Sequence, residues 1–513
     1  MKKQLLIFVF LLNSSINFAQ TFGDGSFFYT IISGTDVFIR KTATCPTGDL
    51  TIPSTIDRYG TTYTITTIGS AAFKDCTGIT SVTIPNTVTT IRPWAFKGCT
   101  GITSVSIPNS VTSIEGGAFD SCSSLTSVSI PNSVVSIGSY AFRDCTGLTS
   151  ATLSNTLTDI ALGMFEHCSN LTGITIPTSV TSIGASAFIG CSGLTNITIP
   201  TSVTNIETQA FDACTGLTSI TIPNSVTDIG NGAFGNCISL SNISIPDSVI
   251  NIGIATFENC TSLTNFSIPN SITSISNRMF KDCTNLTSIS IPNSVISIGY
   301  MAFYNCPSLA SINFPDSLTS IGNHAFAHCT GLTSINFPDS LTSIGQNAFQ
   351  NCTGFTSLNF PSSVTSIGQA AFYNCNSLTS VTVNWSTPLV VPTDTFLNVD
   401  VSTIPLTVPD GTTALYQTAD VWKDFGSYVV LSTEELTKNS LSIQLYPNPV
   451  KDQLNVSLFN NLILHQIYIY NYLGQLIKKS NVPSIDVSDI KDGVYFAKIV
   501  TDKGKVTKKI IIE

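Results

Sequence analysis

Fourteen cysteines recur every 23 residues from Cys76 to Cys375, and each follows a phenylalanine by three residues. Cysteines at a fixed spacing can form disulfides, bind a metal ion or pack as buried thiols. Equivalent cysteines of adjacent repeats would lie about 5 Å apart, within disulfide range, but identical side chains on stacked repeats point in parallel. No CxxC motif occurs. We therefore expect buried free thiols, with disulfides as the second interpretation and metal binding as the third.

Two histidines, His324 and His328, lie four residues apart beside Cys329, a spacing that can bind zinc on one helical turn. Only four histidines occur in the chain, and no Ser/His/Asp or paired-carboxylate grouping stands out. Surface histidines without a metal are therefore the favoured interpretation. We expect no catalytic residue, no bound metal and no cofactor, and hence a protein that is not an enzyme.

The period of 23 residues predicts the elements that position these side chains. Counted from each cysteine, aliphatic residues occupy offsets +3, +6, +8, +12 and +15, as in the repeat that begins at Cys214. A period of about 20–29 residues with such offsets is typical of leucine-rich repeats, in which each turn adds one strand and a short return. We predict an α/β repeat solenoid with a parallel β-sheet, and a short helix around each Ala-Phe pair at offsets +19 and +20.

Two further positions shape each turn. A proline at offset +9, as in Pro108 and Pro223, has no amide proton to donate and therefore ends the strand. A serine or threonine occupies offset +11 in all fourteen repeats, from Thr87 to Ser386. Because buried backbone polar groups need partners, we expect these hydroxyls to face inward and to bond the backbone of the turn.

One face of the predicted sheet is chemically uniform. Side chains alternate across a strand, so offsets +5 and +7 point away from the inward +6 and +8, and in no repeat do they hold a charged, aromatic or histidine residue. Protein interfaces usually depend on buried Trp, Tyr or Arg anchors, so this face favours sugars, ordered water or covalent glycans over a tight protein partner. The candidate ligand-facing residues are Ser81, Thr83, Ser104, Ser106, Ser127, Ser129, Asn196, Thr198, Ser219, Thr221, Asn242, Ser244, Ser288, Ser290, Ser334 and Asn336.

Composition argues against binding to nucleic acid and against a span across a membrane. The 513 residues are 42% hydrophobic and 10% charged, with a net charge of −9. Residues 68–400 contain 6 Lys and Arg against 16 Asp and Glu, so the repeats lack the basic face that nucleic-acid phosphates require. The longest apolar run, 5–12, is too short for a transmembrane helix, so we expect no membrane span.

The two ends of the chain depart from the repeat. Solenoids need atypical end turns, because a regular terminal turn would expose its apolar face to water. At the C-terminal end we expect an amphipathic helix in which Leu415, Tyr416 and Trp422 cover the last turn. The expected divisions are a secretory signal at 1–19 cleaved near Ala19, an N-terminal cap at 20–67 with an insertion at 57–62, repeats at 68–400, a C-terminal cap at 401–431, a linker at 432–440 and a small all-β sandwich at 441–513.

The repeat unit LTSIxIPxSVTSIGxxAFxxC resembles the BspA-like class of leucine-rich repeats over about 310 residues. This resemblance implies a secreted or surface protein, and many members of the class are associated with adhesion to host matrix, other microbes or surfaces. It does not identify a ligand.

The tail is similar to a type IX secretion sorting domain of type A, through LYPNPVKDQLNV at 445–456, IYNYLGQLI at 469–477 and IDVSDIKDGVYFAKI at 485–499. The resemblance implies the type IX machinery as a partner, passage across the outer membrane, and removal of the tail with anchoring or release. The expected sorting residues are Tyr446, Pro447, Asn448, Pro449, Gly474, Asp492, Gly493 and Tyr495.

Together these features predict a secreted or cell-surface protein that presents its Ser/Thr/Asn-rich face to an extended ligand such as a glycan, a matrix or another cell surface. The alternative is a structural spacer, or an ordered-water (ice) binding solenoid whose hydroxyl rows template a lattice. The internal uniformity of the repeats favours this alternative, whereas the curvature typical of a leucine-rich sheet argues against a flat ice-binding plane.

Overall fold

The computed structural model describes residues 21–431 and 443–513, apart from 43, 459–461, 472–474 and 502–503. The expected signal segment at 1–19 and linker at 432–440 lie outside the described residues. The chain divides into two compact units, Met1–Leu406 with Gln417–Ser427, and Thr407–Tyr416 with Tyr428–Glu513. Each unit is described by itself.

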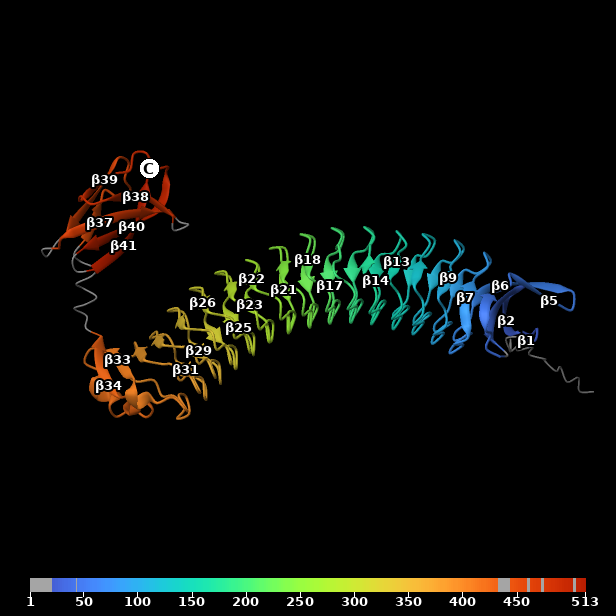
Figure 1. Cartoon of the computed structure of the whole chain (residues 1–513), viewed down its shortest axis with the longest axis horizontal. Helices are drawn as coiled ribbons and strands as arrows, with labels where there is room; N and C mark the ends of the chain where they lie inside the picture. The colour runs from blue at the N-terminus through green and yellow to red at the C-terminus, as the bar shows by residue number, and fades with distance from the viewer. Residues whose placement is uncertain (1–20, 43, 432–442, 459–461, 472–474, 502–503) are drawn as a thin grey trace, which may run out of the picture. The chain divides into compact units, whose positions relative to one another are not determined.

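The first unit is a stack of turns that follow one another in sequence order (Figure 1). Nearly every turn adds a short parallel strand to a first series, and equivalent residues pair in register, as Ser127 does with Ser150 and Ser129 with Thr152. In the turn that follows Cys191 the strand is reduced to a single bridge, between Thr198 and Thr221. The strands of this series are β4 (Gly48–Thr51), β7 (Ile79–Thr83), β9 (Ser104–Ser106), β11 (Ser127–Ser129), β13 (Ser150–Thr152), β15 (Gly173–Ile174), β18 (Ser219–Thr221), β20 (Asn242–Ser244), β22 (Asn265–Ser267), β24 (Ser288–Ser290), β26 (Ser311–Asn313), β28 (Ser334–Asn336), β30 (Ser357–Phe360) and β32 (Ser380–Val383).

A second series of two-residue strands runs along another side of the stack and was not predicted from the sequence. It begins at β6 (Thr61–Ile68) and continues through offsets +14 and +15 of the repeats, where Asn205 pairs with Asp228 and Ile206 with Ile229. The other members are β8 (Thr90–Ile91), β10 (Ser113–Ile114), β12 (Ser136–Ile137), β14 (Asp159–Ile160), β16 (Ser182–Ile183), β17 (Asn205–Ile206), β19 (Asp228–Ile229), β21 (Asn251–Ile252), β23 (Ser274–Ile275), β25 (Ser297–Ile298), β27 (Ser320–Ile321), β29 (Ser343–Ile344) and β31 (Ser366–Ile367).

The third side of each turn is not the short helix that the sequence predicted. In the segment that leads to Cys214, Gln209 and Ala213 both have a φ of 55°, so left-handed residues interrupt every possible helical run. The Phe211 N–H donates to the carbonyl of Ala233 in the next turn at 2.8 Å, whereas the Cys214 N–H donates to the Phe211 carbonyl at 3.2 Å. Alternate backbone N–H groups of this segment therefore donate to the next turn of the stack, and those between them donate to a carbonyl three residues earlier. This pattern produces a stack of turns with almost no helix.

The interior consists of continuous columns of identical side chains. From Phe73 to Phe372 the phenylalanine rings stack nearly parallel, for example Phe211 with Phe234 at 5.5 Å between centroids and 1° between planes. These phenylalanines are 0% exposed, as are most of the leucines at offset +3, such as Leu217. The inward columns predicted from the repeat are therefore confirmed.

The cysteine column is buried, and thirteen of its members, from Cys99 to Cys375, are free thiols. Each of these thiols donates to the carbonyl of the phenylalanine in the preceding turn, as Cys214 does to Phe188 at 3.1 Å. The first member departs from the expectation of free thiols, because Cys76 forms a disulfide with Cys45. Cys45 lies in the N-terminal cap, outside the period, so the parallel orientation that keeps column neighbours apart does not apply to it.

The hydroxyls at offset +11 form the expected inward ladder. Ser202 donates to the Val180 carbonyl of the preceding turn at 2.6 Å, and Ser340 donates to the Leu318 carbonyl at 2.6 Å. The same bond is made by Ser110, Thr156, Ser179, Ser271, Ser294, Ser317 and Ser363. The ladder has gaps, because the buried hydroxyls of Ser133, Ser225 and Ser248 have no partner.

The N-terminal end of the stack is closed by β-hairpins. Strands β1 (Thr21–Gly23), β2 (Phe27–Ser33) and β3 (Asp36–Thr42) are antiparallel, and β3 joins the second series by parallel pairing with β6. The insertion expected at 57–62 is the tip of a hairpin between β5 (Thr55–Arg58) and β6. The ring of Phe27 packs edge-on against Phe73, the first ring of the column, at 5.8 Å.

At the C-terminal end Phe396 continues the ring column, 5.6 Å from Phe372. Trp422 is 0% exposed, packs 6.1 Å from Phe396, and donates from Nε1 to the Leu389 carbonyl at 2.7 Å. The elements that follow Phe396 along the chain are η1 (Val401–Thr403), β33 (Pro405–Pro409), α1 (Thr413–Tyr416), η2 (Trp422–Asp424) and β34 (Ser427–Leu431).

The prediction of an amphipathic helix in the C-terminal cap is wrong in its length. The helix α1 is a single turn, and Val421 has a left-handed φ of 69° before η2 begins. Leu415, expected to cover the last turn, is 48% exposed.

Residues 443–513 of the second unit form two antiparallel sheets, one of three strands and one of four. Buried residues of both sheets, such as Val456 and Ile499, belong to a single hydrophobic cluster, as an all-β sandwich requires. The strands are β35 (Ile443–Tyr446), β36 (Gln453–Leu458), β37 (Leu464–Tyr470), β38 (Leu476–Ser480), β39 (Ser484–Asp486), β40 (Gly493–Thr501) and β41 (Gly504–Ile512).

Candidate binding surfaces

The outer face of the first strand series carries the residues predicted to contact a ligand. Fifteen of the sixteen are exposed and Ser81 is half-buried. Ser81 donates to Asp49 and Asn196 donates to Thr195; the other candidates form no side-chain hydrogen bond within the described residues. Their hydroxyl and amide groups are therefore free to bond solvent or a ligand.

The threonines at offset +4, immediately before this face, behave differently. Thr126 donates its hydroxyl to the Thr103 carbonyl of the preceding turn at 3.1 Å, and Thr149 donates to the Thr126 carbonyl at 3.0 Å. These hydroxyls are committed to joining adjacent turns. Offsets +5 and +7 thus differ from +4 in function although all three are rich in serine and threonine.

Two shallow hollows lie along this face. One, of about 620 Å³, is lined by Ser106, Ser129 and Thr152 among other residues. The other, of about 640 Å³, includes Asn196 and Thr198 and lies beside Gly173, where the row lacks a side chain. The candidate residues therefore form two places where the face is concave rather than flat.

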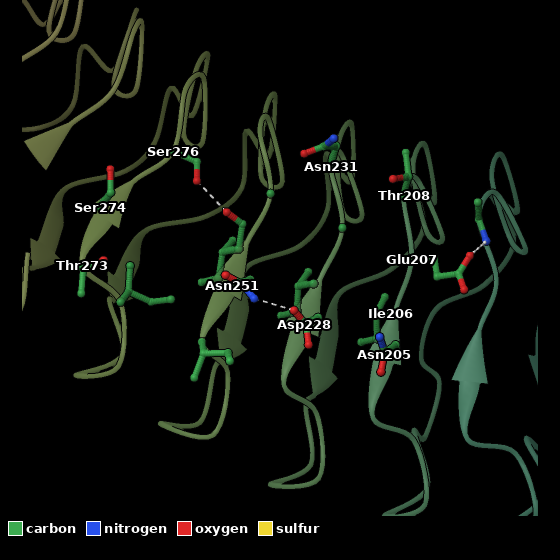
Figure 2. Close-up of a pocket in the computed structure, with 17 residues that line it drawn as sticks. Asn205, Ile206, Glu207, Thr208, Asp228, Asn231, Asn251, Thr273, Ser274 and Ser276 are labelled. Atoms are coloured by element: carbon green, nitrogen blue, oxygen red, sulfur yellow. Dashed lines mark hydrogen bonds between the residues drawn. The ribbon is translucent and has the colours of Figure 1, made fainter.

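A third hollow, of about 550 Å³, lies over the second strand series and was missed by the sequence analysis (Figure 2). Its polar groups bond one another: Asn251 donates to Asp228 at 2.6 Å, and Glu207 accepts from the Ala185 amide at 3.0 Å. Hydrogen bonds from Thr227 and Asn251 lower the pKa of Asp228. Because these groups are already paired, the hollow offers little to a polar ligand.

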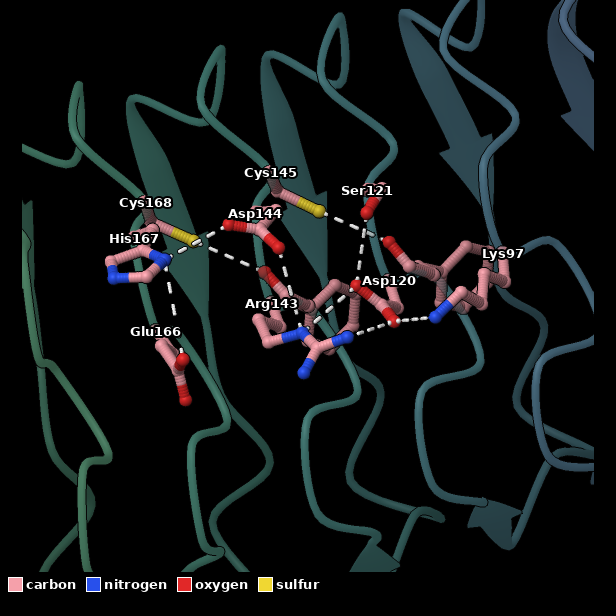
Figure 3. A network of polar contacts seen from close by, with 11 residues as sticks. Lys97, Asp120, Ser121, Arg143, Asp144, Cys145, Glu166, His167 and Cys168 are labelled. Carbon is pink, nitrogen blue, oxygen red and sulfur yellow. Dashed lines mark hydrogen bonds and ion pairs between the residues drawn. The ribbon is translucent and has the colours of Figure 1, made fainter. Parts of the chain in front are cut away.

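On the third side, a charged cluster connects consecutive turns (Figure 3). Asp120 is 1% exposed and is bonded by Lys97 at 2.7 Å and by Arg143 at 2.8 Å. Burial by itself would raise the pKa of Asp120, but hydrogen bonds from Arg143 and Lys97 outweigh it and the pKa is lowered. Lys97, Asp120 and Arg143 are spaced by the 23-residue period, so aligning the repeats would have revealed this cluster.

The paired histidines do not lie on a helix. His324 packs edge-on against Tyr300 at 6.0 Å, and His328 packs against Tyr304 at 5.1 Å. Burial, followed by the charge of His328, lowers the pKa of His324. Among the residues that the structure covers, no three His, Cys, Asp or Glu side chains are grouped as metal ligands.

Burial affects the reactivity of the free thiols through their pKa. Burial raises the pKa of Cys191 to about 12 against an opposing hydrogen bond with the Cys168 backbone, and burial also raises the pKa of Cys237 to about 12. Since the thiolate is the nucleophile and metal ligand, the raised pKa makes Cys191 and Cys237 poor nucleophiles and poor metal ligands at neutral pH.

In the second unit, the predicted sorting residues lie at exposed edges. Tyr446 ends β35 and is 46% exposed, and Pro447, Asn448 and Pro449 are exposed after it. Asn448 accepts from the Ile511 amide at 2.8 Å and donates to the Lys509 carbonyl at 3.2 Å, so this segment is fixed to β41.

The other sorting residues come from the third segment. Asp492 is exposed before β40, Gly493 begins that strand, and the Tyr495 hydroxyl donates to the Lys491 carbonyl at 2.9 Å. Gly474 lies outside the described residues. No helix in the described parts of the chain has the length and apolarity needed to cross a bilayer.

This architecture, a parallel-strand solenoid with a buried column at every inward offset, is that of a leucine-rich repeat protein. The family profile described as "BspA type Leucine rich repeat region (6 copies)" matches residues 66–195, 181–310 and 296–419. The chain belongs to this family. The profile described as "Secretion system C-terminal sorting domain" matches residues 444–513, which is consistent with a secreted or surface protein.

One solved structure supports the same assignment, and a second is reported beside it as similar in sequence. A leucine-rich repeat protein from Bacteroides ovatus is 30% identical, with a TM-score of 0.58 over 67% of this chain and 95% of its own. A leucine rich cell surface protein from Faecalibacterium prausnitzii is 31% identical, with a TM-score of 0.47 over 71% of this chain and 94% of its own. None of the curated proteins matches this chain.

Proposed function

We propose that this protein is a non-enzymatic binding or adhesion protein of the cell surface or the secreted fraction. Its first-series face contacts an extended ligand, a glycan or a glycan-bearing matrix. The observation that carries this proposal is the row of exposed hydroxyl and amide groups at offsets +5 and +7, most of which have no bond within the described residues. Such groups can exchange hydrogen bonds with water for hydrogen bonds with sugar hydroxyls at low cost.

Export also supports this proposal. The signal segment is cleaved near Ala19, and the type IX machinery recognises 441–513 and removes this tail during passage. The solenoid is then exposed to surfaces outside the cell. Anchoring or release would both leave the first-series face accessible.

The test is binding of the purified full chain to a glycan array and to immobilised matrix. Replacing Ser104, Ser106, Ser127 and Ser129 together by glutamate should lower the affinity about tenfold or more, because bulky charges fill and repel the contact surface. A matched control replaces Ser320, Ser343 and Ser366 of the second strand series by glutamate and should bind like the parent chain. Equal binding by both variants, or no binding to any glycan or matrix, would contradict the proposal.

A second candidate function, an ordered-water binder or structural spacer, is favoured by the in-register pairing of the strands. Ser219 pairs with Asn242 and Thr221 with Ser244, so polar groups recur at the strand spacing along the face. Thermal hysteresis of the purified chain is the measurement that distinguishes this function, because glycan binding alone produces none.

A further inference from the structure

A groove of about 660 Å³ lies on the third side of the solenoid, away from both strand series, and carries two aromatic side chains. Trp94 is 53% exposed, and Tyr140 occupies the equivalent position two turns later. Both have left-handed backbones, with φ of 59° and 61°. The equivalent residues of other turns, such as Gln209 and His324, have the same conformation, so it belongs to the repeat and not to these two aromatic residues.

Glycines in the following turns provide the seat for each ring. A Cβ atom on Gly117 would come within 2.6 Å of Cδ1 of Trp94, and one on Gly163 would come within 2.4 Å of the Tyr140 ring. No side chain can therefore occupy these two positions while the rings stay in place. At this position of four consecutive turns the residues are Trp94, Gly117, Tyr140 and Gly163. Each ring therefore packs against the glycine of the next turn, and Gly117 leaves space between the two rings.

Neither ring is fully used by the protein itself. Trp94 stacks on no other ring or cation in the described chain, and its indole N–H has no partner there, whereas the guanidinium of Arg143 lies 5.1 Å from the Tyr140 ring centre. The other two tryptophans, Trp385 and Trp422, are 6% and 0% exposed. Trp94 is thus the one tryptophan placed to contact a ligand.

The rim of the groove is polar but electrically balanced. Lys97 and Arg143 bond Asp120, Arg143 also lies 3.5 Å from Asp144, and Lys74 lies 3.9 Å from Asp75. Three cations thus face three carboxylates. Arg143 has further N–H groups beyond those on Asp120, so the rim can bond uncharged hydroxyls, while an anionic ligand would compete with existing ion pairs.

We propose that this groove binds a neutral oligosaccharide. The C–H faces of sugar rings pack on the electron-rich faces of Trp94 and Tyr140, while the sugar hydroxyls bond Arg143 and Lys97. Two turns separate the aromatic rings by roughly 10 Å if each turn advances by the strand spacing, which suits separate residues of one extended chain. The hollow is of small-ligand size rather than that of a stable protein interface. This site is independent of the first-series face.

Trp94 provides its own reporter. Because the other tryptophans are buried, acrylamide quenching of the fluorescence of the full chain reports mainly on Trp94. The probes are neutral hexasaccharides of glucose, xylose, mannose and N-acetylglucosamine, with hexagalacturonate as the charged comparison. We expect saturable protection from quenching by at least one neutral hexasaccharide and none by hexagalacturonate.

Calorimetry with the bound hexasaccharide tests the residues. Trp94→Ala should weaken binding about tenfold or more and Tyr140→Ala about fivefold, whereas Trp94→Phe should keep most of the affinity. The matched control is Gln209→Ala, at the same position of a turn whose neighbours carry Ser186 and Gly232 there and no aromatic residue. Ser127→Glu with Ser129→Glu should also leave this binding unchanged, which separates the groove from the first-series face.

Three results would overturn the proposal: no neutral hexasaccharide protects Trp94, Trp94→Ala binds as tightly as the parent chain, or hexagalacturonate binds more tightly than every neutral probe. Binding of a protein that depends on Trp94 while no saccharide binds would also overturn it and assign the groove to a protein partner.

Discussion

Replacing Phe211 by alanine is expected to lower the free energy of unfolding of the solenoid by about 3–5 kcal/mol, as for other buried phenylalanines. The ring is 0% exposed and stacks between Phe188 at 5.3 Å and Phe234 at 5.5 Å. Truncation leaves a cavity in the middle of the column that rigid neighbours cannot fill. Denaturant unfolding, followed by circular dichroism, measures the loss.

In Phe211→Ala the shape of the unfolding transition should change together with its midpoint. Each turn contacts only its neighbours, so a weak turn uncouples the two halves of the array and one transition becomes two. Phe211→Leu, which keeps most of the volume, should cost less than about 1.5 kcal/mol, and the exposed Gln209→Ala should stay within about 0.5 kcal/mol. An unchanged unfolding profile for Phe211→Ala would show that the ring column does not couple the turns.

Removing the disulfide between Cys45 and Cys76 should have the second largest effect. It closes a loop of 31 residues that joins the cap to the first regular turn. The chain-entropy model gives about 3–4 kcal/mol for a loop of this length. Cys45→Ala should therefore loosen the cap, and hydrogen exchange of the β2 and β3 amides should speed up before that of the central turns.

A free thiol at the other end of the column supplies the control. Cys375→Ala removes one thiol that donates to the Phe349 carbonyl at 3.2 Å. We expect it to lower the free energy of unfolding by about 1 kcal/mol and to leave hydrogen exchange in the N-terminal cap unchanged. A reductant should lower the melting temperature of the parent chain but not that of Cys45→Ala. If the reductant changes neither, the disulfide does not stabilise the cap.

Much of this fold is predictable because the period repeats each physical constraint many times. Leu217 and Ile220 mark inward positions that every turn repeats, and Ser202 marks the hydroxyl ladder. The second strand series escaped prediction because Asn251–Ile252 is only two residues long, too short for an alternating pattern. Its existence depends on stacking of turns, which no single repeat encodes.

The helical return was predicted wrongly for a related reason. A spacing of three residues between Phe211 and Cys214 fits a helix, but it also fits a tight turn in which the Cys214 amide bonds the Phe211 carbonyl. The left-handed positions that decide between them hold residues as different as Trp94, Gln209 and His324. Their conformation is imposed by bonds to the next turn, not by residue type.

The candidate surfaces divide in the same way. The exposed face at offsets +5 and +7 follows from strand alternation, so Ser127 and Ser129 could be placed from the sequence. The disulfide partner Cys45 could not, because it lies outside the period. The groove at Trp94 and Tyr140 depends on residues two turns apart, which become neighbours only when the turns stack in register.

Register is the central claim, and alkylation of the native chain without reductant tests it most directly. If every turn superimposes on the next, the thirteen thiols from Cys99 to Cys375 should resist iodoacetamide while the chain is folded and all react in guanidinium. Mass spectrometry should find Cys45 joined to Cys76 and no other bridge. Rapid labelling of consecutive cysteines in the folded chain, or disulfides between adjacent repeats, would contradict the stacked columns on which both binding proposals depend.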